Sequence, residues 1–335
     1  MNFGKTFVVL FLHTHVSVYG QTVQNAKDLR TKLMTTDGYD ITVRPIADQS
    51  DFVRVNVSLA LLALNSLDDV AGVLTTTAYM KVLWTDSELQ WTPATYGNLA
   101  STFFPQDNIW KPDIALKNSN KDYTTLGIPS LNVEVSNDGT IEWYPFEIFT
   151  STCSVDITYF PFDVQICHLK FVAWSYGPDE VYLKDGGGVD FSNYEESPSW
   201  DILDNSVAEE QIGEDIALSF TIKMKRKSLY AMLSVVLPIL LLSVLKLFVF
   251  VLPADKSSYS VTVFLAFAIF LTIVEATMPN NSLSVAVFSI YVILMTAQST
   301  VVTIIAVFEE RALTFDEDEI KIPKWLFSLS NLGGN

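Results

Sequence analysis

Six positions in the apolar segment 253–279 lie four and three residues apart, so they share one face of a helix. They are Ser258, Thr262, Leu265, Ile269, Thr272 and Ala276. We call this set the polar stripe. Aromatic residues occupy the other side. Hydroxyl groups along a membrane helix can form the wetted wall that ions need, and apolar residues among them can interrupt the flow. Such residues also pack membrane helices together, so this helix alone leaves both interpretations open.

Three apolar segments, 229–252, 258–277 and 284–308, surround or contain this stripe. Each is long enough to cross a hydrocarbon layer of ~30 Å at ~1.5 Å per residue. We therefore expect a transmembrane domain over residues 229–308. Residues 1–20 combine Lys5 with a short apolar core and small residues near their end, which predicts a signal peptide.

The segment 21–228 between them carries 30 acidic and 15 basic side chains, nearly all of the chain's net charge of −17. This charge argues against nucleic acid as a partner, and it attracts cations. The basic residues 223–227 favour a cytoplasmic start of the first membrane helix, but long domains are translocated largely regardless of charge. We therefore expect residues 21–228 to be extracellular.

Short segments rich in β-forming residues recur through this domain, at 51–64, 75–83, 131–135, 141–144, 164–173 and 216–224. Turn residues separate them, which predicts an antiparallel β-sandwich, with a short helix near 24–34 before it. The glycine-rich segment 185–190 is expected to be a surface loop, since it lacks the spacing of a calcium-binding loop. The chain has three histidines and no cluster with metal-ligand spacing, so we expect no enzyme, no metal and no cofactor.

The chain has two cysteines, Cys153 and Cys167. In a secreted β domain these predict one disulfide, worth roughly 3 kcal/mol in the loop-entropy model. The loop that it closes contains an apolar tip, Phe160-Pro161-Phe162. An exposed aromatic loop favours burial, and the neighbouring membrane helices supply a surface for it.

The cysteine spacing with its central FPFD resembles the signature of the Cys-loop receptors, the pentameric ligand-gated ion channels. Further blocks occur in family order: WTDSELQW, IWKPDIAL, FVAWSYG, LYAMLSVVLP and FVLPAD. The chain is most similar to the nicotinic-type, cation-selective branch, over about residues 25–325. This resemblance implies an extracellular β-sandwich above a helical bundle in the plasma membrane, with four further subunits around a pore that the second membrane helix lines.

The resemblance also implies a ligand site between adjacent subunits, in which aromatic rings bind a small extracellular molecule by cation–π attraction. The positions that match are Trp174, Tyr176, Tyr79, Tyr144, Glu134 and Glu142. Two features depart from the family: Lys117 stands where cholinergic members have tyrosine, and segment 203–217 (loop C) has no aromatic residue. A lysine ammonium repels a cationic amine. We therefore do not expect acetylcholine, and hypothesise a larger, amphipathic or zwitterionic ligand.

For the pore, the resemblance implies acidic rings at Asp255 and Glu275 that select cations, and an apolar constriction at Leu265 and Ile269. Lys256 is the evidence against cation selectivity. Lys246, inside the first membrane helix, is expected to extend its ammonium to the headgroups, and Pro238 to bend that helix.

For gating, the resemblance implies that Asp69, the Phe160–Phe162 tip and Arg226 couple the two domains, with an Asp69–Arg226 ion pair as a latch. The 278–283 linker receives the motion.

The sequence therefore predicts a subunit of a cation-selective, ligand-gated channel. The alternative is a non-conducting or modulatory ligand-binding subunit. It rests on the altered ligand site and on the expectation that residues 309–335 begin a cytoplasmic segment with no fourth membrane helix after it. Asn56 begins a glycosylation sequon in the extracellular domain.

Overall fold

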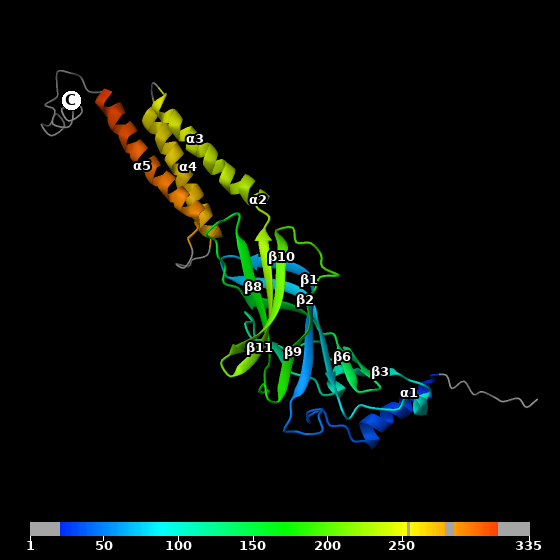
Figure 1. Cartoon of the computed structure of the whole chain (residues 1–335). Helices are drawn as coiled ribbons and strands as arrows, with labels where there is room; N and C mark the ends of the chain where they lie inside the picture. The colour runs from blue at the N-terminus through cyan, green and yellow to red at the C-terminus, as the bar shows by residue number, and fades with distance from the viewer. Residues whose placement is uncertain (1–20, 253–254, 279–284, 314–335) are drawn as a thin grey trace, which may run out of the picture.

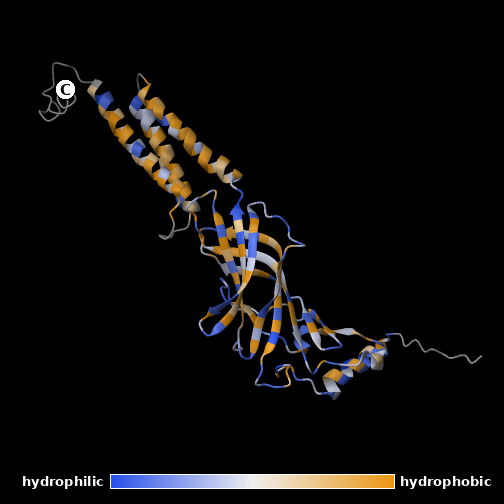
Figure 2. Cartoon of the chain, in the orientation of Figure 1, coloured by the Kyte–Doolittle hydropathy of each residue, from blue (hydrophilic) through white to orange (hydrophobic). Residues whose placement is uncertain are grey.

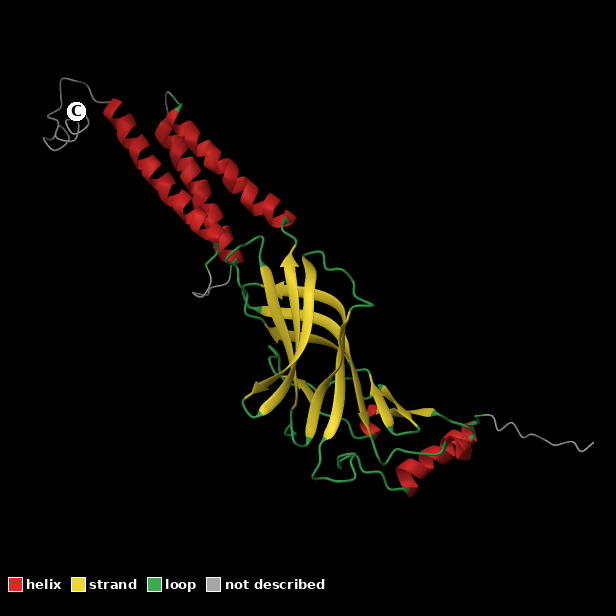
Figure 3. Cartoon of the chain, in the orientation of Figure 1, coloured by secondary structure: helices red, strands yellow, loops and turns green. Residues whose placement is uncertain are grey.

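The computed structural model describes residues 21–252, 255–278 and 285–313, so the predicted signal peptide 1–20 lies outside the described residues. A β-sandwich forms the middle of an elongated molecule, with three long helices at one end and helix α1 at the other (Figure 1). The strands and helices are segregated along the chain as well as in space (Figure 3). The predicted order of a β-sandwich followed by a helical bundle is confirmed.

Two sheets face each other in the sandwich. The first has the order β3 (Ser101–Pro105), β5 (Asn132–Ser136), β6 (Thr140–Trp143), β2 (Val73–Thr85), β1 (Val53–Asp68) and β9 (Val181–Asp190), with β7 (Phe146–Thr152) also paired to β2. The second has the order β10 (Trp200–Ile212), β11 (Asp215–Arg226), β8 (Val164–Ala173) and β4 (Ile114–Leu116). The named strand pairs are antiparallel, except that β1 and β9 run parallel.

Strand β2 illustrates why the sequence forms these sheets. Its residues alternate between buried and half-buried from Val73 to Trp84, because successive side chains of a strand point to opposite faces. The buried set ends at Trp84, whose ring packs edge-on against Trp110 and Trp143 at centroid distances of 6.1 and 6.4 Å. These indoles form the centre of the sandwich core.

The glycine-rich segment 185–188 is part of strand β9, so the prediction of a surface loop was wrong. The carboxylate Oδ1 of Asp185 accepts hydrogen bonds from the N–H groups of Gly187 (3.0 Å) and Gly188 (2.6 Å). Gly188 has a φ of +76°, and the pairing with β1 shifts register at this place. The glycines therefore form an irregularity within a paired strand, which their composition alone does not distinguish from a turn.

Before the sandwich, helix α1 (Val23–Thr31) continues into a wider turn, η1 (Lys32–Thr36). Two single 3₁₀ turns, η2 (Pro93–Tyr96) and η3 (Gln106–Asn108), lie between strands. The chain between β10 and β11 is a two-residue turn, since Ile212 pairs with Asp215. The predicted loop C, 203–217, is therefore mostly a regular hairpin.

Among the residues that the structure describes, three helices are long and apolar enough to cross a membrane: Leu229–Phe250, α4 (Lys256–Thr277) and α5 (Val287–Leu313). Figure 2 shows their predominantly hydrophobic residues. The first comprises α2 (Leu229–Ala231), a wide turn η4 (Met232–Val236), α3 (Leu237–Leu247) and a final turn η5 (Phe248–Phe250). The wide turn ends two residues before Pro238, which lacks the N–H that a regular helix requires.

The loop closed by the cysteines packs against the helical bundle. Val155 and Ile157 are buried in one apolar cluster with residues of α3 and α4. The backbone N–H of Val287 donates to the carbonyl oxygen of Thr158 (3.0 Å), and Phe160 lies 6.4 Å from Phe288 between ring centroids. The expected contact between loop and helices is therefore present, although Phe162 remains 57% exposed.

Candidate functional site

Trp174 emerges at the end of strand β8 with its indole half-exposed. Its backbone N–H donates to the carbonyl oxygen of Asp113 (3.1 Å), and the next N–H, of Ser175, donates to Asp113 Oδ2 (2.8 Å). Strand β4 pairs antiparallel with β8, so the backbone of Lys117, one residue beyond β4, lies beside Lys170, and its N–H donates to the carbonyl oxygen of Lys170 (2.7 Å). The long Lys117 side chain nevertheless reaches the tryptophan. The Lys117 Nζ is 5.3 Å from the centroid of the Trp174 ring.

The same ammonium is also bound by the tip of the β10–β11 hairpin. Lys117 Nζ lies 2.7 Å from Oδ2 of Asp215, the first residue of β11. The two side chains are 32% and 34% exposed, respectively, so water reaches this ion pair. The predicted aromatic position thus already has a cation over its ring, supplied by the chain itself.

Tyr123 is a further aromatic residue at this place, and the sequence analysis missed it. Its ring centroid lies 5.4 Å from that of Trp174, with an angle of 32° between the planes. Burial, and then the charge of Asp113, raise the pKa of the Tyr123 phenol. The segment from 117 to 126 has no regular structure, so no periodicity places Tyr123 near Trp174. A cavity of about 380 Å³ is lined by Lys117, Tyr123 and Trp174 together with β7.

The ring of Tyr176 packs on Trp110 rather than on Trp174 or Tyr123. It packs at 6.2 Å from Trp110 between centroids, and the Trp110 Nε1–H donates to its hydroxyl (3.4 Å). Trp110 belongs to the sandwich core. Tyr176 therefore faces the core, and its predicted ligand contact receives no support from this placement.

The remaining predicted ligand residues gather on the first sheet. Tyr79 and Tyr144 meet edge-to-face at 6.3 Å, and the Tyr144 hydroxyl donates to Glu142. Glu134 lies directly opposite Glu142 in the β5–β6 pair. Burial, and then the hydrogen bond to Glu142, raise the pKa of Tyr144 to about 12. Lys81 Nζ lies 5.9 Å from the centre of the Tyr144 ring.

The two ligand groups come from different sheets. Trp174, Lys117 and Asp215 belong to or directly follow strands of the four-stranded sheet, whereas Tyr79, Tyr144 and the two glutamates belong to or follow strands of the seven-stranded sheet. The ring contacts and side-chain hydrogen bonds given above do not join one group to the other.

The polar stripe lies on the exposed side of helix α4. All six of its residues are exposed, with Leu265 at 56% and Ile269 at 51%. Ser260, Val263, Phe267 and Val274 form the buried side. The hydroxyls of Thr262 and Thr272 donate to the carbonyl oxygens of Ser258 (2.9 Å) and Ile269 (2.7 Å). Within this chain the stripe is therefore not a packing seam.

The two charged residues at the start of α4, Asp255 and Lys256, have different surroundings. Asp255 is exposed, whereas the Lys256 ammonium pairs with Glu309 of α5, Nζ to Oε1, at 2.6 Å. The helix that carries Lys256 also receives a contact from Glu310, whose carboxylate accepts the N–H of Ser257 (3.2 Å). Glu275, at the other end of α4, is exposed.

Lys246 is buried, so the prediction that its ammonium reaches the headgroups was wrong. Its Nζ donates to Oε1 of Gln298 in α5 (2.8 Å) and lies 5.8 Å from the ring centre of Phe267 in α4. The position of Lys246 along its helix did not reveal these neighbours. The lysine therefore connects all three helices.

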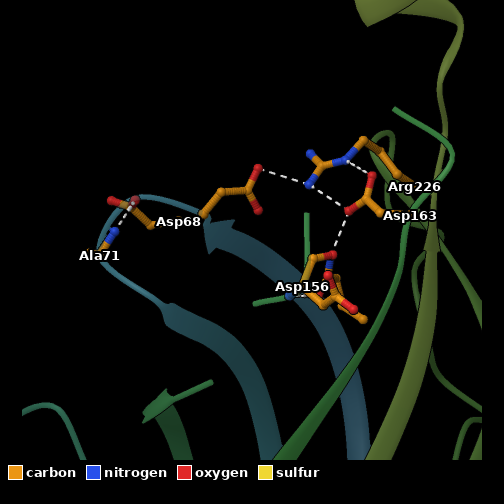
Figure 4. Close-up of polar contacts among 7 residues, drawn as sticks. Asp68, Ala71, Asp156, Asp163 and Arg226 are labelled. Atoms are coloured by element: carbon orange, nitrogen blue, oxygen red, sulfur yellow. Dashed lines mark hydrogen bonds and ion pairs between the residues drawn. The ribbon is translucent and has the colours of Figure 1, made fainter. Parts of the chain in front are cut away.

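Arg226, the last residue of β11, binds two carboxylates where the sandwich meets the bundle (Figure 4). Its Nε and Nη2 lie 2.8 and 3.0 Å from the two oxygens of Asp163, and Nη2 lies 2.8 Å from Oδ2 of Asp69. The guanidinium also stacks 4.3 Å from the ring centre of Trp200 and 5.3 Å from that of Phe160. The predicted Asp69–Arg226 ion pair is present, and Asp163 is a partner that the sequence analysis missed.

Further hydrogen bonds fix the segments that carry these carboxylates. The Oδ1 of Asp68 accepts the N–H of Ala71 (2.8 Å) in the turn after β1 (Figure 4). Gln165 Nε2 donates to Asp163 Oδ2 (2.6 Å) and to the carbonyl oxygen of Asp156 (2.8 Å). Burial raises the pKa of Asp69, and the charge of Arg226 opposes this effect.

Cys153 and Cys167 form the predicted disulfide. Asn56 is half-buried within β1, which is paired on both sides, and this position argues against a glycan there. The linker 278–283 lies outside the described residues except for Met278. So does the 309–335 segment beyond residue 313.

Comparisons with known proteins agree with this arrangement. A family model described as "Neurotransmitter-gated ion-channel ligand binding domain" matches residues 26–228. Mouse neuronal acetylcholine receptor subunit alpha-6 is 33% identical over 301 residues, covering 86% of this chain and 60% of the relative. Acetylcholine receptor subunit beta-type acr-3 of Caenorhabditis elegans is 30% identical over 306 residues, 89% of this chain and 61% of the relative.

Acetylcholine receptor subunit beta-like 1 of Drosophila melanogaster is 31% identical over 285 residues, 81% of this chain and 54% of the relative. The chain thus spans little more than half the length of the curated relatives it matches.

Proposed function

Because the chain belongs to the neurotransmitter-gated ion-channel family, we propose that it is one subunit of a pentameric cation channel that an extracellular small molecule opens. Members of this family are channels rather than enzymes. The chain is a multi-pass plasma-membrane protein with an extracellular N-terminal domain. Four further subunits, identical or different, complete the ring.

The observation that carries the proposal is the exposed polar stripe of α4. Hydroxyl groups recur along one exposed face of α4, as expected of a helix that lies beside a water-filled path. Ser258 and Thr262 lie toward one end of the stripe, and Leu265 and Ile269 form an apolar section beyond them. In a ring of five subunits these two residues would close the pore by excluding water.

The charges around the stripe favour cations. Asp255 and Glu275 are exposed near the two ends of α4, and rings of acidic side chains attract cations. Lys256, which argued against this selectivity, is paired with Glu309 on another helix. Its charge is therefore directed at α5 and partly neutralised.

The ligand site would form between neighbouring subunits. One subunit would contribute the group around Trp174, and the next subunit the group around Tyr79 and Tyr144. The two groups lie on different sheets, so one chain cannot easily surround a ligand with both. We do not expect acetylcholine to be the ligand, because Lys117 holds a positive charge over Trp174 and segment 203–217 of the β10–β11 hairpin has no aromatic residue.

Ligand binding would reach the pore through the Arg226 cluster. Arg226 ends β11, the same strand whose first residue, Asp215, contacts Lys117. The cluster joins this strand to Asp69 and Asp163, and Phe160 beside it contacts Phe288 of α5. A displacement of the hairpin therefore has a continuous path of contacts to the bundle.

One observation favours the alternative of a non-conducting, modulatory subunit. The chain's own ammonium occupies the face of Trp174, so a simple amine agonist is disfavoured. Expression in oocytes under voltage clamp tests both functions. We expect ligand-dependent cation current, and a current that persists without ligand when Leu265→Ser wets the constriction. Surface-exposed pentamers of Leu265→Ser that pass no current would support the modulatory function instead.

A further inference from the structure

The pair Lys117–Asp215 places two opposite charges side by side at the ligand site. The ammonium is 2.7 Å from the carboxylate and 5.3 Å from the ring centre of Trp174. Carboxylate and ring together form the environment that binds a ligand's ammonium group. Here the chain fills that environment with its own lysine. A ligand that enters must therefore separate the two charges or bind beside them.

We propose, on the basis of the proposed function, that the ligand of this site is a small zwitterion whose carboxylate binds Lys117 and whose ammonium binds Asp215. Such a molecule inserts between the two side chains and replaces one ion pair by two. Each charge keeps a partner of opposite sign. The ligand's ammonium then takes the place over Trp174 that Lys117 leaves.

Ligands with a single charge do not fit this pair equally well. An amine that binds Asp215 leaves Lys117 without a counter-charge and places two ammonium groups near one ring. A carboxylic acid that binds Lys117 leaves Asp215 unpaired. Because both side chains are about one-third exposed, water compensates part of this loss, and the expected preference for a zwitterion is that of about one charge-assisted hydrogen bond.

The surroundings permit the insertion. Both side chains are about one-third exposed, and exposed ion pairs contribute little to stability, so their separation is not a large barrier. A cavity of about 380 Å³ lies directly beside Lys117 and Trp174, with Tyr123 on its wall. Its lining also includes Lys121, Asp122 and Glu147, so it presents both signs of charge. This volume is within the range of small-molecule sites.

The test compares matched probes on the full chain, purified in lipid nanodiscs. Three zwitterions, glycine, 4-aminobutyrate and glycine betaine, are each paired with the alcohol in which CH₂OH replaces the carboxylate: ethanolamine, 4-aminobutan-1-ol and choline. Ligand-observed NMR titrations give the dissociation constants. We expect at least one zwitterion to bind about tenfold or more tightly than its alcohol, the effect of one charge-assisted hydrogen bond.

Variants assign this preference to the pair. Lys117→Met is expected to bring the ratio of the two dissociation constants to about one. Asp215→Asn is expected to lower the affinity for the zwitterion and for its alcohol alike, since both molecules carry the ammonium group that binds Asp215. Lys170→Met is the matched control: Lys170 also holds the hairpin, through Glu210 at 2.8 Å, but that pair contains neither Lys117 nor Asp215. For Lys170→Met, the ratio of the dissociation constants of zwitterion and alcohol is expected to equal that of the parent protein.

Three results would overturn the proposal: equal affinities within every pair, no saturable zwitterion binding, or a preference that survives Lys117→Met. These outcomes are independent of conduction. If zwitterions bind with the expected ratio but no current follows, the zwitterion site stands and the channel proposal fails. If Leu265→Ser conducts but no zwitterion binds, the channel proposal stands and the zwitterion site fails.

Discussion

Replacing Arg226 by Gln is expected to destabilise the extracellular domain strongly. The substitution leaves Asp163, whose side chain is 1% exposed, and Asp69, at 16%, without their cation. Breaking a buried ion pair in this way costs about 3–5 kcal/mol. The stacking of the guanidinium on Trp200 and Phe160 is lost as well, at about 0.5–2 kcal/mol for each ring. Protonation of Asp69, whose pKa burial already raises, offsets part of the loss.

Because protonation of Asp69 offsets a loss comparable to that of the stacking, we expect the free energy of unfolding to fall by about 3–5 kcal/mol in total. For a domain of this size, about 1 kcal/mol corresponds to roughly 2–4 °C in Tm. The variant should therefore unfold about 6–20 °C below the parent protein. Scanning fluorimetry of the purified protein at one fixed scan rate measures this shift, since unfolding of a membrane protein is often irreversible.

Two further variants make this prediction specific. Adding Asp163→Asn to Arg226→Gln removes the more buried of the two uncompensated charges, so the double variant should recover about half of the lost Tm or more, a positive coupling between neighbouring sites. Arg54→Gln removes an exposed guanidinium that lies over Phe52 and should shift Tm by no more than about 2 °C. A Tm shift of Arg226→Gln no larger than that of Arg54→Gln would show that burial does not make this ion pair important. A further drop in Tm on adding Asp163→Asn would show the same.

Three other variants test separate parts of the molecule. Asp255→Asn should reduce the cation-to-anion permeability ratio about fivefold, the effect of ~1 kcal/mol near a charge in water, and an unchanged reversal potential would contradict the assigned ring. Replacing Cys153 and Cys167 together by Ser should cost about 3 kcal/mol and lower Tm accordingly, whereas an equal Tm would show that the loop needs no covalent closure. Burial, and then the charge of Lys170, lower the pKa of His168 from 6.5, so the unfolded chain binds the proton first. Stability should therefore fall as pH drops from 6.5 toward the lowered value, and His168→Gln should flatten this slope in Tm measured from pH 7.5 to 5.5; parallel slopes would contradict it.

The sequence predicted features that depend on local periodicity. The polar stripe follows from helical spacing alone, and its exposure agrees with the spacing. The alternation along β2 likewise identifies its buried face. The disulfide followed from two cysteines in a β domain. In each case the side-chain direction is set by the backbone of one element, so neighbours distant in sequence are not needed.

Several features that depend on distant neighbours were missed, and the Asp69–Arg226 ion pair was predicted only through the family resemblance. Lys246 was expected at the headgroups because its distance from the helix end is short, but Gln298 and Phe267 hold it inside. Asp215 was not recognised as the partner of Lys117, because their contact requires the exact register of the β10–β11 hairpin. Tyr123 lies in an irregular segment, where no period indicates which way a ring points. The glycines of β9 carry the composition of a turn, yet the strand continues through them, because β1 pairs with Asp185 before them and with Val189 after them.

The central claim is that the polar stripe of α4 faces a water-filled pore. Neither native cysteine is free, since both form the disulfide. Single cysteines can therefore be introduced at stripe positions Ser258, Thr262 and Thr272, and at the buried positions Val263 and Phe267 as controls. A charged, membrane-impermeant thiol reagent is applied while current is recorded.

We expect the reagent to modify the stripe cysteines and block the current, and to leave the cysteines at 263 and 267 unmodified. Equal modification of both sets, or protection of the stripe alone, would contradict a pore lined by this face of α4.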